Sequence, residues 1–217
     1  MSRLPLLLVA GLLIPGALLA QAGAPLKGKL EGDTYRSATG EFSVPLLVLR
    51  ELGGTVTDTE NVVTFTDSYS THISIACFPQ DALQRWELET RGRRDYLLYF
   101  FTEFVLADFA KRFPGSSIEA ARFVPELMEG SIITYSLLPG GSYFEPTTGI
   151  AAPAPENRVV AKRGTLLFVR NRYVYVLSTE LAERATKRDG YQATAEQENA
   201  QLTSRLTELV SRLAFRK

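Results

Sequence analysis

The chain has 217 residues, 45% of them hydrophobic, and its 24 basic and 24 acidic side chains leave no formal net charge. This balance excludes nucleic acid and anionic membranes as main partners, because both bind through concentrated positive charge. A single cysteine, Cys77, excludes an internal disulfide; we expect a small buried side chain there, with a reactive or intermolecular thiol as the alternative. A chain of this length can bury its own core and fits one domain.

Residues 1–22 have the pattern of a signal peptide. Arg3 precedes the apolar run Leu4–Ala20, and Ala20–Gln21–Ala22 matches the small-x-small rule of signal peptidase. The run is short for crossing a bilayer. We expect cleavage after Ala22, a periplasmic or secreted protein, and no stable membrane insertion after cleavage. An uncleaved anchor is the alternative.

The polar segment Gly23–Gly32 is expected to be a flexible leader, followed by a single domain over residues 33–217. The first part of that domain alternates short β-rich runs with turn-forming residues, which predicts a meander of strands. The runs are Tyr35–Leu49, Gly54–Asp58, Val62–Asp67 and Thr71–Phe78. In the last run, His72 and Cys77 are predicted on opposite faces, because their separation is odd.

Two longer helices are predicted. Arg93–Phe113 carries phenylalanines at helical spacing and ends at Pro114–Gly115, after a shorter helix over Asp81–Thr90. Ala195–Phe215 has one apolar stripe, which indicates an amphipathic helix lying across a sheet. The stripe consists of Leu202, Leu206, Leu209, Val210 and Leu213.

Strands are predicted at Ser117–Val124 and Ser131–Leu138, and then twice within Arg158–Thr179. Both faces of this last pair are apolar, as in strands that are covered on both sides. The link Arg170–Asn171–Arg172 suits a tight hairpin, because Asn tolerates positive φ. We therefore expect two central antiparallel strands in a sheet enclosed by helices.

Prolines and glycines interrupt residues 139–157 too often for a regular element. A long irregular link between neighbouring strands is either functional or mobile. Its Tyr143 and Phe144 are the best candidates for contact with a partner, since two aromatic side chains are seldom left in solvent without a role. The alternative is that they pack down and anchor the loop.

No catalytic, cofactor or metal motif stands out. His72 is the only histidine, and its sequence neighbours Asp67, Ser68 and Ser70 do not make a catalytic triad, so we interpret it as a structural or surface residue. Arg91, Arg93 and Arg94 at the start of the long helix could bind an anion, but we favour the interpretation that they are a solvated helix entry. We assign no catalytic residue, cofactor or metal ligand.

The order of these elements predicts an α+β fold with a mostly antiparallel sheet of about six to seven strands. Three stretches, Tyr35–Pro45 (Y…GEFSVP), Phe65–Thr66–Asp67 and Ile73–Ser74–Ile75, resemble the PsbP-like superfamily, whose members are α/β/α sandwiches. The resemblance covers residues 33–215. It implies a scaffold that binds proteins or ligands, generally without catalysis.

Two classes of function follow. The first is an exported, non-catalytic binding or assembly protein with an unknown protein partner or small ligand, whose contact surface is residues 139–157 and the adjoining sheet edge. The second is a hydrolase or transferase that works without histidine, which requires a pocket with two converging carboxylates. A carrier of a small apolar ligand between helix and sheet is a third interpretation.

Overall fold

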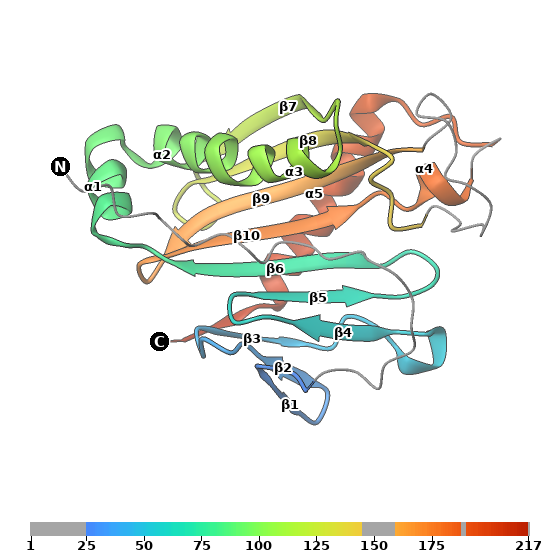
Figure 1. Ribbon diagram of the computed structural model, residues 1–217, viewed down its shortest axis with the longest axis horizontal. Helices are drawn as coiled ribbons and strands as arrows, with labels where there is room; N and C mark the ends of the chain where they lie inside the picture. The colour runs from blue at the N-terminus through green and yellow to red at the C-terminus, as the bar shows by residue number, and fades with distance from the viewer. Residues whose placement is uncertain (1–24, 145–158, 188–189, 217) are drawn as a thin grey trace.

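The computed structural model describes residues 25–144, 159–187 and 190–216. Its main element is a seven-stranded antiparallel sheet in the order β4-β5-β6-β10-β9-β8-β7 (Figure 1). The predicted α+β class is confirmed. The hairpin predicted at the centre is formed by β9 and β10, which are neighbours in the middle of the sheet. The strands are β4 (Thr55–Asp58), β5 (Val62–Thr66), β6 (His72–Pro79), β7 (Ser117–Val124), β8 (Ser131–Pro139), β9 (Val160–Arg170) and β10 (Tyr173–Glu180).

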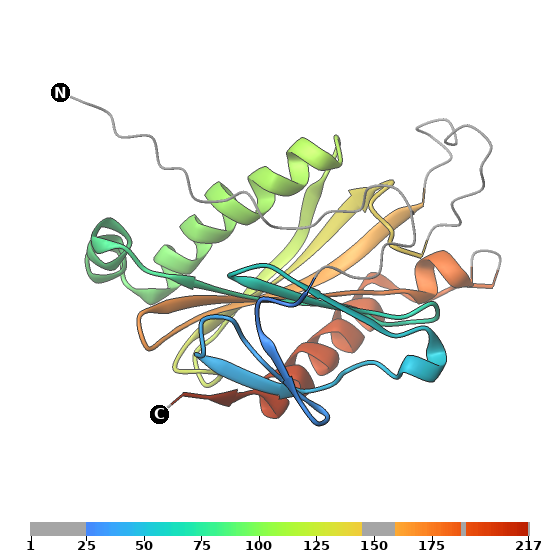
Figure 2. The ribbon, with the colours of Figure 1, turned by 60° about the horizontal axis from the view of Figure 1, so that its bottom comes forward.

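Helices cover both faces of the sheet (Figure 2). After α1 (Ala82–Arg91), three segments follow one another without a break along one face: α2 (Arg93–Phe100), the π-helical segment η2 (Phe101–Leu106) and α3 (Ala107–Arg112). The helix α5 (Ala195–Arg212) crosses the other face, and α4 (Glu183–Thr186) links β10 to it. Among the described residues, no helix has the length and apolar character needed to cross a membrane.

Alternation along β9 divides the core into two layers. Leu166 and Phe168 pack in the layer under α5, whereas Leu167 and Val169 pack in the layer under α2 and α3. Burying each such side chain contributes about 1.5–3 kcal/mol, which explains why both faces of this strand are apolar. Gly164 lets α5 approach closely, because a Cβ there would lie 3.0 Å from Leu202 Cβ.

The turn between β9 and β10 is shorter than predicted. Arg170 is the last residue of β9 and pairs with Tyr173, so that Asn171 and Arg172 alone form the turn. Their φ angles of 51° and 64° are those of a hairpin turn with two left-handed residues, which matches the twist of the strands.

A second, four-stranded sheet in the order β1-β2-β3-β11 corrects two expectations. Part of the expected leader is β1 (Lys29–Glu31), which pairs with β2 (Thr34–Arg36), followed by β3 (Phe42–Pro45) and the 3-10 turn η1 (Arg50–Leu52). The C-terminal helix ends at Arg212 instead of Phe215, and β11 (Ala214–Phe215) pairs with β3. The reason is tertiary: the Phe215 ring packs edge-on against Tyr175, with 5.3 Å between centroids.

Cys77 lies in the core under α5 and is 1% exposed, as predicted for a small buried side chain. Burial raises the pKa of its thiol to about 12. The thiol therefore stays protonated at neutral pH and is a poor nucleophile.

Candidate functional site

Polar side chains replace apolar ones along a band of the sheet face that carries α2 and α3. Thr66 pairs with His72 and Thr64 with Ser74, so that the band continues from β5 to β6. Ser178 and Glu180 of β10 extend it, opposite Thr165 and Arg163 of β9. Strand alternation places all of them on the same face as Val62, Ala76 and Val176 of the apolar layer.

A pocket of about 550 Å³ opens over this band. Its walls are the threonines of β4 and β5, the aromatic rings of Phe113 and Tyr143, and the backbone of Gly140–Ser142. We call it the threonine pocket. Its size is within the range of ligand sites. The polar residues that line it are Thr55, Thr57, Asp58, Thr59, Thr64, Thr66, His72, Ser142, Tyr143 and Arg163.

The floor of the threonine pocket is a buried cluster around Glu180, which is 1% exposed. Its carboxylate accepts hydrogen bonds from the Ser142 hydroxyl (2.6 Å) and the Tyr143 backbone N–H (3.0 Å). His72 Nδ1 lies 3.3 Å and Arg163 Nη2 3.6 Å from the same carboxylate. Glu180 therefore ties the segment after β8 to the sheet and neutralises the buried guanidinium of Arg163.

The protonation states of the cluster follow from these contacts. Burial alone would raise the pKa of Glu180, but His72, Arg163 and the Ser142 hydroxyl together hold it below its ordinary value. Burial lowers the pKa of His72, the charge of Arg163 lowers it further, and Glu180 opposes both without reversing the shift. At neutral pH the floor thus holds one anion, one cation and a neutral imidazole.

This arrangement predicts that stability falls on acidification. Below pH 6.5, the ordinary pKa of histidine, His72 is protonated in the unfolded chain but stays neutral in the folded protein. The unfolded state therefore binds more protons, and the folded state loses stability as the pH drops. Urea unfolding compared at about pH 7.5 and about pH 5.5 should show a larger loss for wild type than for His72→Gln. Glu180 adds to the loss only below its ordinary value of 4.5, outside this interval. An equal loss in both proteins would contradict the prediction.

Tyr143, a predicted contact residue, is both packed against the fold, as a loop anchor would be, and partly exposed, as a contact residue would be. Its ring packs against His72 at a tilt of 31°, with 4.7 Å between centroids, yet the residue is 45% exposed. Phe144 packs edge-on against Tyr143 at 5.5 Å. A role for either residue in partner contact stays a prediction, and residues 145–157 of the expected loop lie outside the described residues.

Other sequence expectations are resolved by the fold. His72 and Cys77 lie on opposite faces, as predicted, and Asp67 caps a turn by accepting the backbone N–H groups of Ser70 and Thr71. Sequence reasoning missed Arg163 and Glu180. The available signal was the presence of charged residues, Lys162 and Arg163 in β9 and Glu180 at the end of β10, in strands whose other residues are largely apolar.

The arginines at the start of the long helix do not form one cluster. Arg91 forms an ion pair with Glu87 and also lies over the Tyr99 ring, whereas Arg93 donates to the carbonyl of Val169. Arg93 instead joins arginines from other elements around a separate depression.

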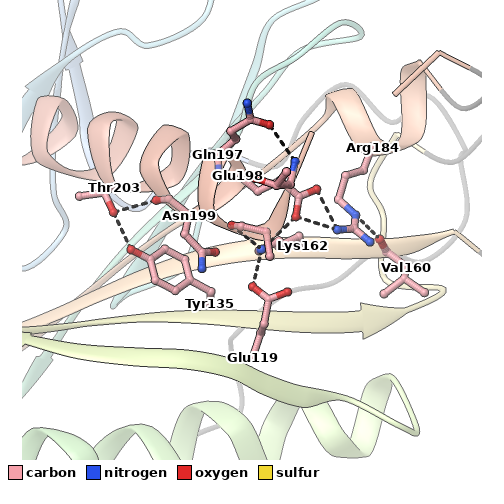
Figure 3. Close-up of polar contacts among 11 residues, drawn as sticks. Glu119, Tyr135, Val160, Lys162, Arg184, Gln197, Glu198, Asn199 and Thr203 are labelled. Atoms are coloured by element: carbon pink, nitrogen blue, oxygen red, sulfur yellow. Dashed lines mark hydrogen bonds and ion pairs between the residues drawn. The ribbon is translucent and has the colours of Figure 1, made fainter. Parts of the chain in front are cut away.

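Two carboxylates do converge elsewhere, on Lys162 (Figure 3). Lys162 is fully buried on the opposite face from Arg163, and its ammonium contacts Glu119 and Glu198. Arg184 holds both oxygens of Glu198, at 2.9 and 3.0 Å. This network is closed to solvent at Lys162 and fastens the first turn of α5 to the sheet, so we assign it a structural role.

The threonine pocket lacks such a pair. Asp58 is the one carboxylate among its described lining residues, and it accepts hydrogen bonds from Tyr35 Oη (2.7 Å) and from the backbone of Lys27 and Gly28. In the described part of the chain, no group of three or more side chains that could hold a metal ion is found.

No family model and no curated protein match the sequence. Similar solved structures include the Ran-binding protein Mog1p of Saccharomyces cerevisiae, with a TM-score of 0.47 and 10% identity, covering 88% of this chain and 96% of that one. They also include cyanobacterial PsbP (CyanoP) from Synechocystis sp. PCC 6803, with a TM-score of 0.49 and 11% identity, covering 93% of this chain and all of that one. The predicted PsbP-like resemblance is confirmed as a likeness of fold, and at these TM-scores it carries no argument about function.

Proposed function

We propose that this chain is an exported, non-catalytic binding protein that holds a segment of a partner protein in the threonine pocket. The observation that carries the proposal is the pocket itself, about 550 Å³ in volume over a floor where the buried charges of Arg163 and Glu180 face each other. Residues 140–143, the edge strand β4 and its neighbour β5 line it, and the sequence predicts a contact surface at residues 139–157 and the adjoining sheet edge.

The lining indicates what the pocket would accept. Threonine methyl groups and the rings of Phe113 and Tyr143 offer apolar contact, while the threonine hydroxyls both donate and accept hydrogen bonds. The floor carries no net charge, because Arg163 and Glu180 balance and His72 is neutral. A partner side chain with an apolar body and an uncharged polar end fits this environment.

The order of contacts argues against nucleophilic catalysis. In a catalytic triad, histidine lies between the hydroxyl and the carboxylate and takes the proton from the hydroxyl. Here Glu180 lies between them, bonding the Ser142 hydroxyl on one oxygen and facing His72 with the other. The lowered pKa of Glu180 also makes it a weak base.

The proposal of export rests on residues 1–22, which lie outside the described residues. Their basic start, apolar run and small-x-small ending are those of a cleaved signal peptide. The intact mass of the chain purified from its native envelope fraction should correspond to a protein beginning at Gly23.

Crosslinking capture from that fraction tests the binding site. Thr57→Phe fills the pocket, and Tyr143→Ala/Phe144→Ala removes the Tyr143 ring from its wall together with the ring that packs against it, so each should reduce recovery of the partner about tenfold, as for loss of an interface anchor. Tyr69→Ala is the matched control, because Tyr69 is 61% exposed and does not line the pocket. Its recovery should equal that of wild type.

Thermal melts establish that each variant is folded before the captured proteins are compared. The proposal fails if folded Thr57→Phe and the double aromatic variant capture the same proteins, in the same amounts, as wild type.

A further inference from the structure

Four arginines from separate parts of the chain surround a second depression, of about 520 Å³. Arg85 belongs to α1, Arg93 begins α2, Arg170 ends β9, and Arg172 lies in the hairpin turn between β9 and β10. We call this the arginine depression. Its lining also includes two carboxylates, Glu89 and Glu129, beside the guanidinium groups of Arg85, Arg93 and Arg172.

The fold holds two of these side chains in place at the depression. Arg85 Nη1 donates to the carbonyl of Gln80 at 2.8 Å, and Arg93 Nη1 donates to that of Val169 at 3.2 Å. The guanidinium of Arg170 instead lies over the Phe215 ring, 4.8 Å from its centroid, in the layer under α5, so we do not count it among the donors of the depression. Each guanidinium has five N–H donors, so one such contact leaves several for a ligand.

The acidic residues do not cancel the positive charge. Glu129 Oε2 lies 3.8 Å from Arg93, and its side chain is 83% exposed. An ion pair of that length and exposure contributes little. The depression therefore keeps an excess of positive charge beside preorganised, planar donors.

We propose that the arginine depression binds a phosphate-bearing ligand with at least two negative charges. Guanidinium groups match phosphate oxygens with paired hydrogen bonds, and several together suit a diphosphate better than a single carboxylate. The volume is sufficient for a ligand larger than one phosphate. The site is independent of the threonine pocket, since Arg170 lies seven residues along β9 from Arg163, ~23 Å at strand spacing.

Titration calorimetry of the mature protein with pyrophosphate at low salt tests the proposal. Arg172→Gln and Arg85→Gln should each weaken binding about tenfold, as expected for loss of one charge-assisted hydrogen bond. Arg94→Gln removes the same charge from an exposed position that does not line the depression, so it should leave the affinity within about twofold of wild type. Arg172 is exposed at a turn, where Gln is under the same backbone strain, so this variant should fold normally.

Flotation with phosphatidylglycerol vesicles distinguishes the source of the phosphate. Pyrophosphate binding that is lost in Arg172→Gln supports a free phosphate ligand. Vesicle binding alone, lost in the same variant and kept in Arg94→Gln, supports the same site for a lipid headgroup. Binding to neither probe, or equal weakening by Arg94→Gln and Arg172→Gln, would overturn the proposal.

Discussion

Replacing Glu198 with alanine is expected to lower the free energy of unfolding by about 3–5 kcal/mol, the cost of breaking a buried ion pair. Glu198 is 3% exposed and accepts from Lys162 Nζ at 2.9 Å and from Arg184 (Figure 3). Its loss leaves the fully buried ammonium of Lys162 with one carboxylate, Glu119, which is itself partly exposed. Urea unfolding followed by circular dichroism measures the loss.

The same helix supplies a matched control. Glu208 pairs with Arg212, and the two side chains are 59% and 49% exposed. Glu208→Ala should therefore cost no more than about 1 kcal/mol. The double substitution Lys162→Met/Glu198→Leu removes both charges and should recover most of the stability lost in Glu198→Ala. Equal losses in Glu198→Ala and Glu208→Ala would refute the assigned role of the network.

Glu180 lies on the other face of the sheet. Glu180→Ala is expected to lower the free energy of unfolding by a similar amount, about 3–5 kcal/mol, because it leaves the charge of Arg163 buried and uncompensated. Arg163 is 4% exposed, and its remaining contact through Nη2 is with the carbonyl of Gly141 at 3.0 Å. The substitution also frees Ser142 and the Tyr143 N–H, and so releases the aromatic wall of the threonine pocket.

Two measurements separate this effect from general damage. Glu31→Ala is the control for stability, since Glu31 pairs with Arg36, both side chains are 57% exposed, and the substitution should cost no more than about 1 kcal/mol. Proton NMR of His72, the only histidine, reports on the site itself. Because Glu180 raises the pKa of His72 against burial, its removal should lower that pKa further. An unchanged His72 titration would contradict the assigned contact.

Local patterns in the sequence were sufficient for the elements and their faces. Alternation along β9 predicts Leu166 and Leu167 on opposite sides, and Asn171 predicts the tight turn. The stripe from Leu202 to Leu213 predicts a helix on a sheet. These signals depend on periods of two and 3.6 residues and on local backbone preference, which act within a few residues.

The same alternation shows where local reasoning ends. Lys162 and Arg163 are adjacent in β9, so a period of two places them on opposite faces. It does not predict that both are buried, because their carboxylate partners come from α5 and from β10. Likewise, closeness in the sequence groups Arg93 with Arg91 and Arg94. The fold instead places it around one depression with Arg85, Arg170 and Arg172.

The sequence by itself thus determined the fold class, the central hairpin and the two-sided burial of the sheet. Tertiary structure alone decided the floor of the threonine pocket, the network around Lys162 and the arginine depression. Each of these joins charges that are distant in the chain. Strand register and helix placement bring them together, and no local pattern encodes either.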